Sequence, residues 1–204
     1  MKSRWSALFE PYADVDHLLQ AFDDLAEHYT ETHRHYHTLA HIHTCLQSFD
    51  QVADEISAGF SLECAIWFHD VIYDPTESDN EELSAMYAGA FLAKMGFNPD
   101  ITSKIEHLIA LTKHPAHPVT DDEKYLLDID LAILGIEPKS YNRYAQWIRQ
   151  EYSFVPENLY REGRSRILQA FLDRSRIFET NIFYDQYEAQ ARRNLRDEIE
   201  ELRQ

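Results

Sequence analysis

Apolar side chains recur at helical spacing along most of this chain. Between residues 14 and 30 they appear every three or four positions, and Asp14 can cap the first turn. A second helix is predicted over 37–58. A third, capped by Ser61, is predicted to end at Tyr73, because the proline that follows two residues later disfavours helical backbone.

Six further helices are predicted from their start and stop signals. They begin near Asp79, Pro99, Thr120, Pro138 and Pro156, with a last amphipathic helix over 183–203. Thr120 has a glutamate three residues later, which is the spacing of a capping box. With only 5 Gly and 7 Pro in 204 residues and no alternating strand pattern, the chain is predicted to be an all-α helical bundle of about nine helices.

One domain is predicted, because 204 residues suffice for one good hydrophobic core and no Pro-, Gly- or Ser-rich linker interrupts them. Within this single domain, 1–204, we expect a chemically active core over about 30–136. Helices over about 138–203 would pack on it.

The charge balance limits the partners. There are 19 Lys and Arg against 36 Asp and Glu, a net charge of −17, which repels a polyanion and argues against DNA or RNA. A small phosphate ester is still allowed, because a bound cation can reverse the local field. The locally basic segment 160–166 is interpreted as a solvated helix face paired with surrounding acids.

Several absences point to a cytoplasmic location. No run approaches about 18 apolar residues, so no membrane partner is expected, and the N-terminus lacks a signal-peptide core. Cys45 and Cys64 are isolated thiols without CxxC spacing, which favours small buried hydrophobes over a disulfide or a zinc site.

Two carboxylates fall inside apolar runs, Asp70 within 65–72 and Asp130 within 125–134. Burying an ionised carboxylate costs several kcal/mol unless it is paired, protonated or bound to a metal. Asp128 could equally be the buried acid of the second run. A bound cation is the simplest partner, since the chain offers histidines as neutral nitrogen ligands.

Three histidines are the candidate nitrogen ligands. His37 and His41 lie four residues apart, which on a helix places both rings on one face. His69 directly precedes Asp70. A His-Asp pair alone is expected about once by chance in this composition, so only the order of the motifs, each in an apolar setting, gives the set weight.

In this order the motifs resemble the HD-domain metal-dependent phosphohydrolase superfamily, and more narrowly a group of bacterial proteins described as predicted HD phosphohydrolases. The matching segments are Arg34–Ile42, Trp67–Asp74, Asn80–Ala85, Leu111–His114 and Leu127–Gly135. The resemblance implies an all-α fold and a metal held by His41, His69, Asp70 and Asp130. Two nitrogens and two oxygens suit Mn, Fe, Zn or Ni, and Mg could occupy a second, oxygen-richer position, so one or two ions are expected.

The arrangement Tyr36-His37-x-x-x-His41 also resembles that of cyclic nucleotide phosphodiesterases. That likeness implies that His37 is the general acid that protonates the leaving oxygen. Asp70 belongs to the predicted catalytic set as well, because a carboxylate at that position can bridge two metals. The chain is much shorter than those catalytic domains and lacks a counterpart of their purine-binding region, so cyclic nucleotide specificity does not carry over.

Further residues are candidates around this centre. Arg34, Lys113 and His114 are predicted to bind the substrate's phosphate, and the alternative for Arg34 and Lys113 is an ordinary surface cation. His107 could help to hold a second metal or be a core histidine. Glu81 could orient the attacking water or simply complement a helix dipole.

The function expected from these features is a metal-dependent phosphohydrolase that uses a metal-activated water on a small phosphorylated metabolite or nucleotide. The alternative is a non-catalytic regulatory protein of the same fold that binds metal and nucleotide. Oxygen chemistry at a di-iron centre is a third hypothesis. A homo-oligomer is possible, because Tyr-rich and Leu-rich helix faces could pair with a second subunit.

Overall fold

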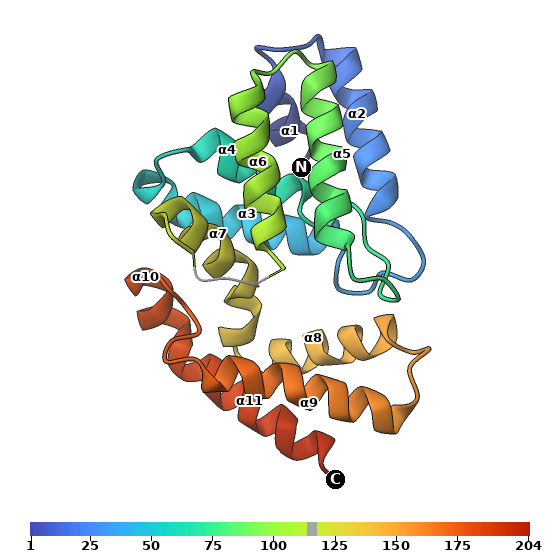
Figure 1. Ribbon diagram of the computed structural model, residues 1–204, viewed down its shortest axis with the longest axis vertical. Coiled ribbons are helices and arrows are strands. Elements are labelled where there is room, and N and C mark those ends of the chain that lie inside the picture. The colour runs from blue at the N-terminus through green and yellow to red at the C-terminus, as the bar shows by residue number, and fades with distance from the viewer. Residues whose placement is uncertain (114–117) are drawn as a thin grey trace. The chain divides into compact units, whose positions relative to one another are not determined.

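The computed structural model describes residues 1–113 and 118–204, and every regular element within these ranges is helical (Figure 1). The α-helices of eight or more residues are α1 (Lys2–Phe9), α2 (Val15–His28), α3 (Leu39–Val52), α4 (Gly59–Phe68), α5 (Asn80–Lys94), α6 (Pro99–Leu111), α7 (Asp121–Leu131), α8 (Pro138–Glu151), α9 (Glu157–Asp173) and α11 (Ala189–Leu202). The predicted all-α class is confirmed. Among the described residues, none of these helices is both long and apolar enough to cross a membrane.

Short helical turns complete the pattern. They are the 3₁₀ turns Ala53–Glu55 and Ala132–Gly135, the three-residue α10 (Asn181–Phe183) and the π-helical turn Tyr184–Glu188. The predicted helix over 183–203 is therefore irregular in its first turns.

The chain divides into two compact units, Met1–Leu126 and Leu127–Gln204, and the division falls inside α7. Charged residues are unevenly distributed between the two units. The C-terminal unit has 12 Lys and Arg against 14 Asp and Glu, a net charge of −2, which leaves 7 against 22, or −15, for the N-terminal unit.

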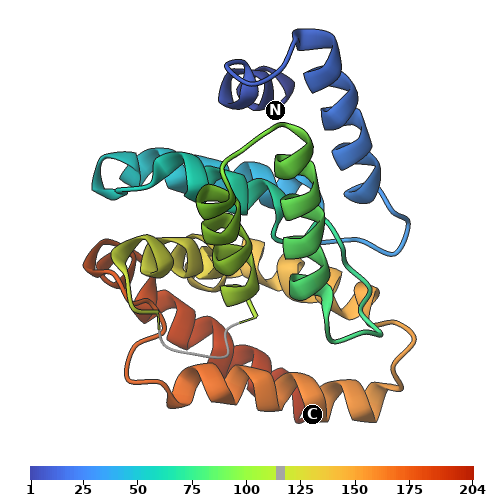
Figure 2. The same ribbon diagram turned by 45° about the horizontal axis from the view of Figure 1, so that its top comes forward.

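An aromatic cluster forms the core of the N-terminal unit. Trp5 of α1 is fully buried and lies edge-on to Trp67 of α4, with ring centroids 5.5 Å apart. Its indole N–H donates to the carbonyl oxygen of Leu18 at 2.9 Å, which ties α1 to α2. In the same unit α5 and α6 lie side by side in both views (Figures 1 and 2).

Three predicted helix starts are confirmed. The carboxylate of Asp14 accepts the N–H of His17, and the side chain of Asn98 accepts the N–H of Asp100. Thr120 and Glu123 each bond the other's backbone N–H at 3.3 Å, so the predicted capping box opens α7.

Two predicted helix starts are wrong. The helix expected over 37–58 begins at Leu39, with Thr38 as its cap, so His37 precedes it. The helix expected to start at Ser61 begins at Gly59, because Asp122 of α7 accepts the N–H groups of Ser57 and Ala58 and replaces a local cap.

The same helix, α4, also ends earlier than the proline signal indicated. It stops at Phe68 instead of Tyr73. The reason is tertiary: the carbonyl of Trp67 accepts the Tyr29 hydroxyl, and the carbonyls of Asp70 and Val71 accept the Arg34 guanidinium. These bonds satisfy carbonyl groups that would otherwise continue the helix.

In the C-terminal unit α9 and α11 pack against each other (Figures 1 and 2). Between them Arg164 pairs with Glu198 at 2.7 Å, and the hydroxyl of Tyr141 donates to the same carboxylate. The amide of Asn194 donates to the carbonyls of Leu134 and Ile136 at 2.9 Å each and so holds the chain that leaves α7. Buried polar groups are thus paired across this unit.

Candidate metal centre

His69 is the residue that follows the last turn of α4, and its ring is 3% exposed. Its Nδ1 lies 3.0 Å from the carbonyl oxygen of Ile66. Because a carbonyl only accepts, Nδ1 carries the proton, and Nε2 of the neutral ring keeps its lone pair. This is the arrangement by which proteins prepare an imidazole to bind a metal through Nε2.

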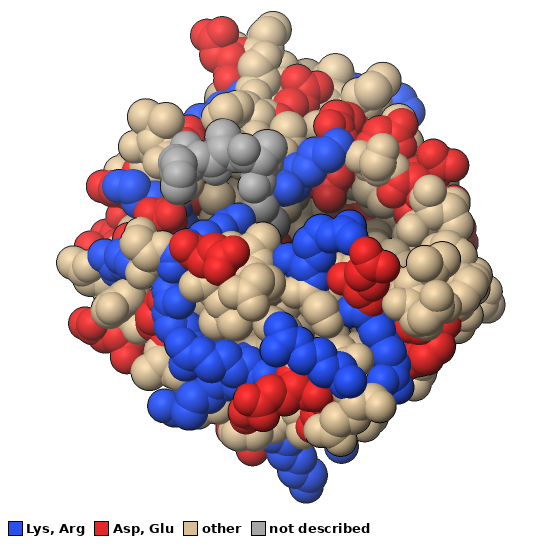
Figure 3. Space-filling view, turned by 60° about the horizontal axis from the view of Figure 1, so that its bottom comes forward, with Lys and Arg blue, Asp and Glu red and all other residues tan. Residues whose placement is uncertain are grey.

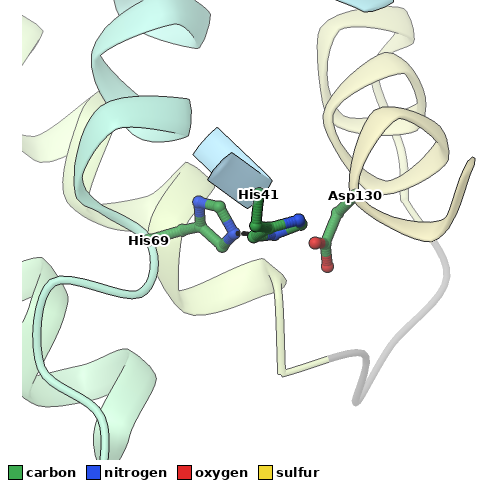
Figure 4. A group of neighbouring side chains, drawn as sticks. All are labelled: His41, His69 and Asp130. Atoms are coloured by element: carbon green, nitrogen blue, oxygen red, sulfur yellow. Dashed lines mark hydrogen bonds between the residues drawn. The ribbon is translucent and has the colours of Figure 1, made fainter. Parts of the chain in front are cut away.

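His41 is the third residue of α3, and its Nε2 lies 3.1 Å from Nε2 of His69 (Figure 4). Both rings are buried. For these two Nε2 atoms to form a hydrogen bond, one must carry a proton. Because His69 is protonated on Nδ1, the donor is Nε2 of His41. Two ring nitrogens that face the same point are the geometry expected of two ligands of one ion.

The carboxylate of Asp70 joins the pair. Its Oδ2 lies 3.1 Å from Nε2 of His69 and 3.5 Å from Nε2 of His41, and its side chain is 18% exposed. Burial raises the pKa of Asp70, but positive charge on His69, His37 and His41, when these rings are protonated, outweighs it and holds the pKa well below its usual range. An ionised oxygen therefore faces the same point as the two nitrogens.

Asp130 lies on α7, and Figure 4 draws it with the two imidazoles. It is partly exposed. Its neighbour on the same helix, Asp128, is fully buried and accepts the N–H groups of Glu179 and Thr180 at 2.8 and 2.7 Å and the hydroxyl of Thr180 at 2.6 Å. Of the two acids in this apolar run, Asp128 has a structural role, and its partners are protein groups.

His37 precedes α3 but stays near the cluster. Its ring centroid lies 6.2 Å from that of His41. The ring stacks on Tyr73, with centroids 4.1 Å apart and planes at 29°, and meets Tyr36 edge-on at 5.0 Å. The expected neighbourhood of His37 and His41 is therefore present, although a loop and not one helical face produces it.

The three residues expected to bind phosphate differ in their surroundings. The side chain of Arg34 is 0% exposed, and its guanidinium contacts Glu31 and backbone carbonyls. Lys113 lies 2.6 Å from both the carbonyl oxygen of Ser78 and the carboxylate of Glu82. His114 lies outside the described residues, and the phosphate-binding roles stay predictions.

Two further candidates have protein partners. His107 is a surface residue whose Nε2 lies 3.2 Å from Glu123, so it is not a core histidine. Glu81 lies 4.0 Å from Lys113, at the start of α5.

Cys45 is a neighbour of the cluster that lies outside the candidate ligand set. It is buried one turn after His41 on α3, and its sulfur lies 3.7 Å from both ring nitrogens of His41. The spacing of four residues is the signal that would have found it. Tyr73, which stacks on His37, was also not predicted as part of the site. Its position in the apolar segment after His69 was the only signal in the sequence.

Basic side chains gather on one face of the protein, with carboxylates between them (Figure 3). In the predicted solvated segment, Arg161 pairs with Glu157 and Arg166 pairs with Glu162, each four residues away. The segment thus behaves as a helix face of paired charges, except for its buried Arg164.

Comparison with known proteins found no match among protein-family models, curated proteins or solved structures. The likeness to HD-domain phosphohydrolases therefore stays a prediction from the motifs.

Proposed function

We propose that this protein is a metal-dependent phosphohydrolase that cleaves a phosphate ester of a small metabolite or nucleotide. The observation that carries the proposal is the meeting of His41 Nε2, His69 Nε2 and Asp70 Oδ2 within 3.5 Å of one another in a largely buried position. Two nitrogens and an anionic oxygen at such distances suit a borderline divalent cation.

The donor chemistry fits that ion. His69 presents an unprotonated Nε2 because Ile66 accepts its other N–H, and Asp70 is ionised. We assign Asp130 as the fourth ligand. Its support is its place in the third motif, Leu127–Gly135, of the resemblance that implies this ligand set.

When bound, the cation would lower the pKa of a coordinated water and neutralise charge on a phosphoryl oxygen. His37 would donate a ring proton to the leaving oxygen as general acid. The stacking on Tyr73 supports this role because it fixes the plane of the His37 ring. Asp70 would keep the two imidazoles oriented and supply anionic charge.

Charge favours a small substrate. The N-terminal unit, which contains His37, His41 and Asp70, carries a net charge of −15. A polyanion would be repelled, whereas a small ester needs only the local field of the cation. The proposal places the protein in the cytoplasm, where buried free thiols such as Cys45 and Cys64 stay reduced.

The test is a panel of phosphate mono- and diesters, including nucleotides, incubated with protein loaded with Mn²⁺, Fe²⁺, Zn²⁺, Ni²⁺ or Mg²⁺. We expect hydrolysis by the wild type and its loss in His37→Ala and Asp70→Ala. His43→Ala, an exposed histidine on α3, is the matched control that keeps activity.

Two outcomes would overturn this function. A metal-loaded wild type that hydrolyses nothing while binding a nucleotide would favour the regulatory alternative. Two tightly bound, coloured iron ions with oxygen consumption would favour di-iron chemistry.

A further inference from the structure

Arg34 is a buried cation that contacts both the segment of His37 and the segment of Asp70. It lies in the segment before α3, and its side chain is 0% exposed. Its Nε donates to the carboxylate of Glu31 at 2.8 Å. The guanidinium carbon lies 5.2 Å from the ring centroid of Tyr29 and 5.4 Å from that of Tyr73, so two aromatic faces border the charge.

The remaining donors of Arg34 go to backbone carbonyls around the candidate ligands. Nη1 donates to the carbonyl of Asp70 at 2.6 Å and to that of His37 at 3.1 Å. Nη2 donates to the carbonyl of Val71 at 3.0 Å. One planar group therefore connects the segment of the candidate acid with the segment of a candidate ligand, which are far apart in the sequence.

These carbonyls need an external donor. The helix α4 ends at Phe68, so the carbonyls of Asp70 and Val71 are not bonded within a helix. Each would be costly to bury without a partner. Arg34 supplies these bonds and thereby fixes where the chain turns after His69.

From this geometry we infer that Arg34 is a positioning residue of the metal centre, which sets Asp70 and His37 relative to each other, and not a residue that binds the phosphate. This inference rests on the proposed function. A lysine cannot reproduce the role, because its single ammonium lacks the planar fork that reaches carbonyls of two segments at once.

The experiment compares Arg34→Lys with Arg4→Lys in the full chain, using Co²⁺ as the probe. Arg4 is a control in the same unit, since its guanidinium likewise bonds carboxylate and backbone carbonyl oxygens, here two carboxylates and one carbonyl, while its side chain is 27% exposed. Circular dichroism and urea unfolding report the fold. Co²⁺ titration reports affinity, and the visible absorption of Co²⁺ reports ligand geometry.

We expect Arg34→Lys to bind Co²⁺ about 10- to 100-fold more weakly, with an altered absorption spectrum, as is typical when a partner that orients metal ligands is lost. Arg4→Lys should lose stability only. If Arg34→Lys does not fold, Glu31→Gln carries the test, because it loosens the guanidinium while keeping it. Glu31→Gln is expected to lose less Co²⁺ affinity than Arg34→Lys.

The outcomes separate the two proposals. The positioning role would be overturned if Arg34→Lys kept the wild-type Co²⁺ affinity and spectrum but had a raised KM for an ester. If Arg34→Lys does not fold, the same result in Glu31→Gln would overturn it. Arg34 would then be a residue that binds the substrate. A wild type that binds no Co²⁺ would overturn the metal centre, and the positioning role with it.

Discussion

Nδ1 of His69 donates its proton to the carbonyl oxygen of Ile66, 3.0 Å away and three residues earlier in the chain. This short local bond fixes the tautomer of the ring. It leaves Nε2 as a lone-pair donor that faces Nε2 of His41. A histidine in a core would be equally satisfied with its second nitrogen against any N–H or hydroxyl donor, so the pairing of two imidazoles is what points to a cation.

Removal of either imidazole should abolish metal binding. We expect the wild type to bind a divalent ion and to gain about 2.7 kcal/mol of stability at a free concentration of 100 Kd. His41→Ala and His69→Ala should show neither the bound ion in elemental analysis nor the rise in Tm. His43→Ala, on the exposed face of the same helix, should behave like the wild type. Undiminished metal binding in both ligand variants would contradict the proposed metal centre.

The proposed acid should be separable from the ligands. His37→Ala is expected to keep the metal, since His37 is not among the ligands, while kcat falls about 10²- to 10⁴-fold for esters with a poor leaving group. A substrate whose leaving group needs no proton should lose far less. Steady-state kinetics on a matched pair of esters measures this difference. An equal loss for both esters would contradict a role in proton transfer.

Much of the helical framework was predictable because its signals are local. Asp14 and Asn98 act on neighbouring N–H groups, and Thr120 with Glu123 does the same, so the sequence alone placed these starts correctly. The helix α1 was missed, although Trp5 and Phe9 lie four apart and are both fully buried. It is short, and no side chain caps its first turn.

The errors arise where distant residues decide. Asp122 takes the N–H groups at the start of α4, so Ser61 is not its cap. Arg34 takes carbonyls beyond the end of the same helix, and no spacing rule links it to Asp70. Hydrophobic pattern alone likewise could not tell Asp128 from Asp130, because the difference lies in the N–H groups that Thr180 and its neighbour present.

The ion pair inside the C-terminal unit should dominate its stability. The side chains of Arg164 and Glu198 are 9% and 8% exposed. Arg164→Met would leave a buried carboxylate without its cation, at a cost of about 3–5 kcal/mol. Arg166→Met is the matched control, because its pair with Glu162 is exposed and worth at most about 1 kcal/mol. Urea unfolding measures both, and equal losses would contradict a strong buried pair.

Asp128 should give stability a distinctive dependence on pH. Burial raises its pKa from the ordinary 3.8 to about 6, against the opposing effect of the donors from Thr180 and Glu179. Between these values the native state binds more protons than the unfolded state, so the free energy of unfolding falls as pH rises. The shift of about 2.2 units corresponds to about 3 kcal/mol, fully lost above pH 6.

Asp128→Asn removes this titration, so the difference in unfolding free energy, wild type minus variant, should fall by about 2.4 kcal/mol between pH 4 and pH 7, because the rest of the effect is lost below pH 4. The amide also places an N–H₂ against a donor of Thr180, which adds an offset that does not vary with pH. Asp197→Asn, at an exposed position of α11, controls for the loss of one negative charge. A difference that instead grows as pH rises would mean that the three donors outweigh burial and that Asp128 is ionised throughout.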